Sequence, residues 1–195
     1  MVAIQPDEIE AASGRISLPP WPFLETLPAA LDGEDRTAAF RRALADGDAN
    51  LKLRFTDDEP VEALVRDRAR MVDVVLRKAW ALHAGPREKD VDLVAAGGYG
   101  RGELHPCSDI DVMILLPKSD VADGHEGIEH FLTFLWDIGL EVGHSVRTID
   151  DCQHESAADV SVASALIEAR LLAGPDYLFQ AMRRALGQDS VWSSK

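Results

Sequence analysis

Apolar residues recur every three or four positions between Pro60 and His83, and charged residues fill most of the positions between them. In an α-helix this spacing gathers the apolar side chains on one face, so the segment is predicted to be a long amphipathic helix. Asp58 stands just ahead of it, where it is predicted to act as the N-cap. The same periodicity predicts shorter helices over residues 35–45, 126–138, 162–172 and 177–186.

Three further segments are predicted to be strands, over residues 91–96, 110–116 and 140–146. Strands that alternate with helices in this way indicate an α/β fold, with a small mixed sheet flanked by helices. The ends of the chain differ from this pattern. Residues 1–33 are rich in proline and are predicted to form an irregular arm, residues 34–58 a short helix ended by Gly47 and Asn50 followed by a linker, residues 59–187 the main domain, and residues 188–195 a tail.

Two aspartates at the start of the second predicted strand are the first sign of chemistry. Side chains alternate between the faces of a strand, so Asp109 and Asp111 point the same way while Ile110 points the other. Carboxylates this close repel each other unless a cation lies between them, and hard oxygen ligands suit Mg²⁺ or Mn²⁺. The pair is therefore predicted to bind a divalent metal ion.

A glycine-rich turn precedes these aspartates. Its glycines leave room for a polyphosphate to approach backbone N–H groups, while Arg101 and Ser108 offer a charged fork and a hydroxyl donor. Tyr99 either stacks on a nucleotide base or covers the turn. The turn is neither a P-loop nor a dinucleotide-binding fingerprint. The predicted nucleotide-binding residues are Gly97, Gly98, Tyr99, Gly100, Arg101, Gly102 and Ser108.

On these residues the chain resembles the nucleotidyltransferase superfamily typified by DNA polymerase β, in which a glycine turn precedes a strand bearing Asp-x-Asp. Residues 97–117 are more closely similar to the N-terminal catalytic domain of the bacterial PII uridylyltransferase family, and residues 134–148 and 166–174 extend the resemblance. It implies the compact nucleotidyltransferase fold and transfer of UMP from UTP to a tyrosine of a PII nitrogen-regulatory protein, with release of pyrophosphate. Asp109 and Asp111 would be the catalytic acids that bind Mg²⁺.

The superfamily usually adds a third carboxylate from a neighbouring strand. On the third predicted strand only Glu141 offers an acid on the face that also carries Gly143, Ser145 and Arg147. Glu141 is the candidate third catalytic residue, although an exposed glutamate at a strand edge would give the same pattern. The fallback candidates are Asp159 and Glu168, the latter also suited to an ion pair with Arg170.

Composition narrows the range of partners. The formal net charge of −14 opposes binding to phosphate backbones, which argues against a nucleic-acid partner. The two cysteines, Cys107 and Cys152, lack the spacing of a zinc site, and no secretion signal or membrane-spanning run is found. We therefore expect a cytoplasmic protein with UTP and a PII protein as partners, and no membrane association.

Two other functions remain open at this level. A non-catalytic nucleotide-sensing module shares the glycine turn and the Asp-x-Asp, and transfer of a nucleotide to a small cationic acceptor would suit the acidic composition. The resemblance also implies a following HD-type hydrolase domain and ACT domains, for which the 195 residues hold no counterpart. The chain is thus expected to be an N-terminal fragment that binds nucleotide, labels PII weakly or not at all, and lacks uridylyl-removing activity and a response to glutamine.

Overall fold

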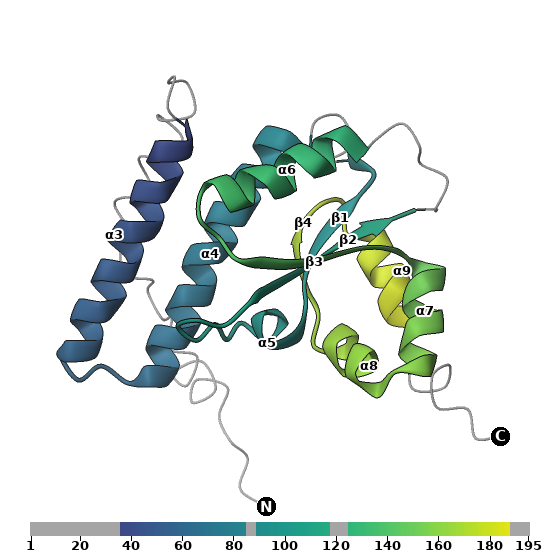
Figure 1. Ribbon diagram of the computed structural model, residues 1–195. Coiled ribbons are helices and arrows are strands. Elements are labelled where there is room, and N and C mark those ends of the chain that lie inside the picture. Colours follow the sequence, from purple (N-terminus) through teal and green to yellow (C-terminus); the bar gives the residue numbers. More distant parts are fainter. Residues whose placement is uncertain (1–35, 85–88, 118–124, 188–195) are drawn as a thin grey trace, which may run out of the picture.

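The computed structural model describes residues 36–84, 89–117 and 125–187, which form a four-stranded sheet between two groups of helices (Figure 1). The predicted arm over residues 1–33 and the tail over 188–195 lie outside the described residues. The elements run in the order α3 (Arg36–Thr56), α4 (Val61–His83), β1 (Asp92–Ala95), α5 (Gly97–Gly100), β2 (Ile110–Leu116), α6 (His125–Asp137), β3 (Val142–Thr148), α7 (Ile149–Ala158), α8 (Val160–Ile167), β4 (Arg170–Ala173) and α9 (Tyr177–Ala185).

The strands lie in the order β3-β2-β1-β4. β1 is antiparallel to both β2 and β4, whereas β2 and β3 are parallel. A parallel pair needs a crossover connection, and α6 lies on that connection. This arrangement confirms the predicted α/β class and the small mixed sheet.

Each face of the sheet has its own hydrophobic core. Leu93, Val112 and Ile114 point toward α4 and α6, where they pack with residues such as Trp80 and Phe131. The alternate positions point to the opposite face, which α7, α8 and α9 cover. The buried residues of that second core are Val94, Met113, Leu115, Cys152, Leu166, Leu178, Phe179 and Met182.

The N-terminal helices differ from the sequence prediction in length. α3 continues through Gly47 and Asn50 to Thr56, so the predicted linker is wrong in this part of the chain. Gly47 is buried on the same face as Phe40 and Leu51, and packing against α4 outweighs the poor helix propensity of glycine. Asp58 is not the N-cap of α4: it lies in a left-handed turn, and Pro60 holds the cap position.

The C-terminal half contains a helix and a strand that the sequence pattern did not predict. Thr148 ends β3 and caps α7 through a capping box with Asp151, although the helix itself has weak hydrophobic periodicity. The predicted helix over residues 162–172 is wrong beyond Ile167, because Arg170–Ala173 forms β4 at the sheet edge. Among the described residues, no helix combines the length and the hydrophobicity needed to cross a bilayer.

Candidate functional site

Asp111 lies on β2, one of the two inner strands, on the face covered by α7, α8 and α9. It is the exposed position in a strand whose other side chains are buried. Its carboxylate borders a pocket of about 390 Å³ between the end of the sheet and α8. The lining residues are Ala96, Gly97, Asp111, Val112, Met113, Gly143, His144, Ser145, Arg147, Ser161, Val162, Ala165 and Leu166.

Two glycines make room for the Asp111 carboxylate. Gly143 is its register partner on β3, and a Cβ atom at position 143 would lie 2.6 Å from Oδ1 of Asp111. A Cβ atom at Gly97 would lie 3.2 Å from Oδ2, and Gly97 also has a φ of +56°, which favours glycine. The carboxylate is thus flanked by bare backbone on both sides and keeps its oxygens open to the pocket.

The electrostatics of Asp111 suit a bound cation. Partial burial of its carboxyl group, followed by the negative charge of Asp109, raises the pKa of Asp111 above its usual value. Asp109 is exposed at the entrance to β2, two residues away on the same face. Without a bound cation, the carboxylates of Asp109 and Asp111 therefore repel each other, and a divalent cation would relieve that repulsion.

The described residues do not supply a third acid. No group of three or more His, Cys, Asp or Glu side chains gathers as a metal site among them. Glu141 is exposed just before β3, and its backbone carbonyl accepts a hydrogen bond from Ile110. Asp159 caps α8 by accepting the N–H of Ser161, which lowers its pKa. Glu168 pairs with Arg101 at 2.6 Å, so the expected Glu168–Arg170 pair is wrong.

The glycine-rich segment folds as one helical turn, α5, and not as an open loop. The N–H of Ala96 donates to the carbonyl of Asp111 at 3.0 Å, so the turn starts beside the metal-binding candidate. A Cβ atom at Gly98 would make only ordinary contacts, whereas one at Gly100 would lie 2.6 Å from the carbonyl oxygen of Glu168. Position 98 thus has room for a side chain, whereas Gly100 is needed for packing, and neither glycine lines the pocket that Asp111 borders.

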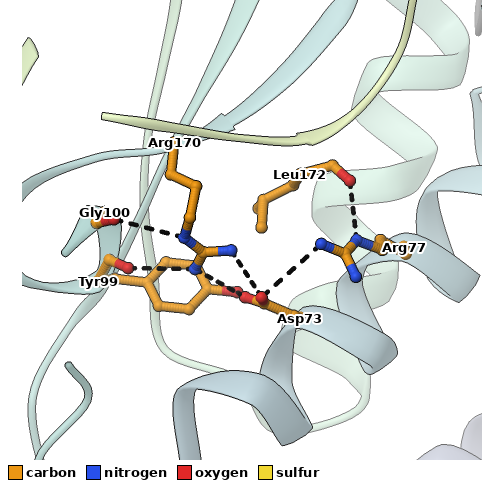
Figure 2. A network of polar contacts seen from close by, with 6 residues as sticks. All are labelled: Asp73, Arg77, Tyr99, Gly100, Arg170 and Leu172. Atoms are coloured by element: carbon orange, nitrogen blue, oxygen red, sulfur yellow. Dashed lines mark hydrogen bonds and ion pairs between the residues drawn. The ribbon is translucent and has the colours of Figure 1, made fainter. Parts of the chain in front are cut away.

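Tyr99 belongs to the support of this turn. Its ring is 1% exposed, and its hydroxyl donates to Oδ1 of Asp73 at 2.7 Å (Figure 2). Burial, together with the charge of Asp73, raises the pKa of the phenol well above its usual value, so it remains a donor. Of the two roles considered for Tyr99, the structure places it in the covering one, and its ring is not accessible to a base.

Arg101 and Ser108 lie outside the pocket that Asp111 borders. The Arg101 guanidinium donates to Glu103 at 3.2 Å and to Glu168 at 2.6 Å, and its side chain is 47% exposed. Ser108 lies on an exposed turn in which its N–H donates to the carbonyl of His105. The fold thus brings Gly97 together with Asp111, while Arg101 and Ser108 stand at the surface nearby in the sequence.

Four polar pocket residues were absent from the predicted site: His144, Ser145, Arg147 and Ser161. Ser145 and Arg147 follow Gly143 at alternate positions of β3, so strand periodicity contained their signal. Arg147 pairs with Glu155 at 2.7 Å, and this ion pair fixes the positively charged guanidinium of Arg147 at the pocket wall. Ser161 comes from the start of α8, and no local pattern relates it to Asp111.

Comparison with known proteins agrees with this geometry. Residues 83–163 match the model of the nucleotidyltransferase domain. The chain is also similar to the bifunctional uridylyltransferase/uridylyl-removing enzymes of Ectopseudomonas mendocina (strain ymp), with 48% identity, and of Pseudomonas aeruginosa (strain LESB58), with 47% identity, in each case over 158 residues.

Those matches cover 81% of this chain but 18% of each relative, so the chain spans less than a fifth of their length. The matched domain includes the glycine turn, β2 and β3, which line the pocket around Asp111 together with α8. The chain therefore carries a nucleotidyltransferase domain, an enzyme domain, and in this region it is homologous to the bifunctional uridylyltransferase/uridylyl-removing enzymes.

Proposed function

We propose that this domain acts in the cytoplasm as a metal-dependent uridylyltransferase, transferring UMP from UTP to a tyrosine hydroxyl of a PII nitrogen-regulatory protein and releasing pyrophosphate. The observation that carries the proposal is the Asp111 carboxylate at the pocket, cleared on both sides by Gly97 and Gly143. The name of the relatives supports uridine as the base.

The residues present fit a magnesium ion. Mg²⁺ commonly binds through one or two carboxylates and takes its remaining ligands from water and substrate phosphates, which matches Asp109 and Asp111 without a third acid. Bound there, it would lower the pKa of the acceptor hydroxyl and offset charge on the phosphates.

The protein's own residues would do the positioning. Gly97 and Gly98 let the triphosphate approach the backbone of the turn, and Arg147 offers a positive charge at the pocket wall. Exposed Ser108 and Arg101 would complete the contacts, Arg101 after leaving its pairs with Glu103 and Glu168. Glu141 is the remaining candidate for a further acid, because strand alternation places it on the face of Gly143.

A nucleotide-sensing module that does not catalyse transfer is the second candidate. The described residues contain no third carboxylate beside Asp109 and Asp111, and that observation favours it. Such a module would still bind the nucleotide and the metal, because those steps use the turn and the two aspartates. Only the transfer step distinguishes the two functions.

The deciding experiment incubates the chain with Mg²⁺, UTP labelled at the α-phosphate and a PII protein, and measures label on PII. Calorimetric titration with each of the four nucleotides, in the presence of Mg²⁺, gives the base preference in parallel. The matched control is Asp46→Asn, which makes the same chemical change as Asp111→Asn at an exposed position on α3.

Label on PII above the level of the Asp111→Asn variant establishes transfer. UTP binding with neither label on PII nor Mg²⁺-dependent release of pyrophosphate supports the sensing module instead. Label on an added aminoglycoside, and none on PII, would establish a small-molecule acceptor. Absence of UTP binding in the wild-type chain would overturn both nucleotide-dependent functions.

A further inference from the structure

We infer that Asp73, Arg170 and Tyr99 are positioning residues that hold the glycine turn in the orientation needed to receive a triphosphate. The inference rests on the proposed function, and it concerns residues outside the pocket that Asp111 borders. The three side chains come from α4, β4 and α5, and Figure 2 shows those of Arg170 and Tyr99 converging on Asp73.

The Asp73–Arg170 pair is the centre of this network. Nη1 and Nη2 of Arg170 donate to Oδ2 and Oδ1 of Asp73 at 2.6 and 3.0 Å, a two-point contact that fixes the plane of the guanidinium. Asp73 is 7% exposed, so loss of the Arg170 guanidinium would leave its negative charge buried without this partner. Arg77, bonded to the carbonyl of Leu172, adds a second positive charge 3.8 Å from Asp73.

The same guanidinium contacts the backbone of the turn. Nη2 of Arg170 donates to the carbonyl of Tyr99 at 3.3 Å, and Nε donates to that of Gly100 at 3.4 Å. These carbonyls lie at the C-terminal end of α5, and that of Tyr99 also accepts the N–H of Gly102 at 3.0 Å. The Tyr99 hydroxyl ties the side chain of the turn to the same aspartate. The backbone and the Tyr99 side chain of the turn are thus both held by the Asp73–Arg170 pair, which we call the anchor.

The anchor lies on the opposite side of the sheet from the pocket. Arg170 points toward α4, whereas Gly97, at the other end of the same short turn, lies beside the Asp111 carboxylate. Gly100, at the C-terminal end of the turn, is packed against the carbonyl of Glu168. The four residues of the turn are therefore expected to move together and not one by one. Loosening the anchor is therefore expected to move Gly97 and Gly98 relative to Asp111.

The test replaces the planar guanidinium while keeping its charge, with Arg170→Lys. A lysine cannot make the two-point contact with Asp73 and reach both carbonyls. Arg54→Lys is the matched control, since Arg54 makes an equivalent two-point contact with Glu59 and also pairs with Asp67 at the start of α4, away from the turn. Tyr99→Phe, which removes a single hydrogen bond, serves as the milder variant if Arg170→Lys does not fold.

Two readouts are measured at a temperature where every variant is folded. Amide hydrogen exchange at Gly100 and Gly102 reports the turn itself, because their N–H groups donate to Ala96 and Tyr99 at 2.8 and 3.0 Å. Calorimetric titration with UTP and Mg²⁺ reports the phosphate site. We expect Arg170→Lys to speed exchange at both glycines and to weaken nucleotide binding at least about tenfold, with Tyr99→Phe intermediate and Arg54→Lys unchanged in both.

The two readouts separate this inference from the proposed function. If the wild-type chain binds no nucleotide, the proposed function fails, and the exchange rates alone then decide whether the network holds the turn. If Arg170→Lys lowers stability but leaves exchange at the turn and nucleotide affinity at the wild-type level, the positioning role is overturned. Equal loss of affinity in Arg54→Lys would overturn it as well, because the effect would then be one of general stability.

Discussion

Asp111 is the residue whose surroundings are most specialised for function. The strand places it, two glycines clear its oxygens, and Asp109 adds a second negative charge. Its raised pKa means that folding favours the protonated carboxyl group. The free energy of unfolding therefore falls as pH rises through the raised pKa and Asp111 ionises. Under the proposed function, binding of a cation would offset this loss of stability.

Asp111→Asn is therefore expected to abolish Mg²⁺-dependent nucleotide transfer while leaving metal-free thermal stability unchanged or higher. The amide would remove a ligand of the proposed metal ion and also the repulsion with Asp109. Thermal unfolding in the presence of a chelator, together with the labelling assay, measures both effects. The exposed variant Asp46→Asn should match the wild type in each, and transfer by Asp111→Asn above a few percent of the wild-type rate would remove Asp111 from the metal site.

The glycine turn shows how neighbouring residues of one element differ in role. Gly98→Ala is expected to fold normally, because its new methyl group meets nothing closer than 3.5 Å, but to weaken triphosphate binding by occupying the space the phosphates need. Gly100→Ala is expected to destabilise the fold instead, because its methyl group would lie 2.6 Å from the Glu168 carbonyl.

Chemical unfolding and calorimetric titration with UTP and Mg²⁺ distinguish these two variants. Comparable stability for Gly98→Ala and the wild type, with lower affinity, is the expected pattern. A stable Gly98→Ala variant with full affinity would show that the triphosphate does not pass this part of the turn.

Helix α9 is tied to the sheet by a buried acid. Asp92 on β1 is fully buried and accepts the N–H groups of Asp176 and Phe179 at 3.0 and 2.8 Å. Burial nevertheless raises the pKa of Asp92, so its contribution to stability is present below the usual aspartate range and declines as pH rises through the raised pKa.

Asp92→Asn is expected to destabilise the protein by about 1–3 kcal/mol at pH 4, because an amide cannot accept from both N–H groups. The difference from the wild type should narrow toward pH 7. Urea unfolding at the two pH values measures this, with exposed Asp90→Asn as the control. A gap that widens with pH would show that the buried environment favours the charged carboxylate.

Elements with a strong periodic signal were predictable from the sequence, and those fixed by distant contacts were not. β2, with Asp111 on it and Asp109 just before it, follows from strand alternation, and α4 follows from its apolar face. β4 has four residues whose identity as an edge strand depends on pairing with β1, more than seventy residues away. The Asp73–Arg170 pair joins residues 97 positions apart, so local spacing contained no signal for it.

At the scale of the whole molecule, charge limits the partners. The formal net charge of −14 repels nucleic-acid backbones, and in the described residues many arginines are already paired with carboxylates. We expect no retardation of single- or double-stranded DNA by this chain in a gel-shift assay, even at low salt, where electrostatic attraction is strongest. Retardation that declines with added salt would reveal a basic surface and reopen the polymer-acting functions.

The opposition of Gly143 and Asp111 across two neighbouring strands links their evolutionary histories. Any side chain at position 143 would have to displace the carboxylate, because even a methyl group would lie 2.6 Å from it. A lineage that does not bind the proposed metal ion would be released from this constraint, whereas one that binds it would not. Among homologues, those that catalyse transfer should thus have glycine at the position of Gly143, whereas those that do not catalyse it are free to have another residue there.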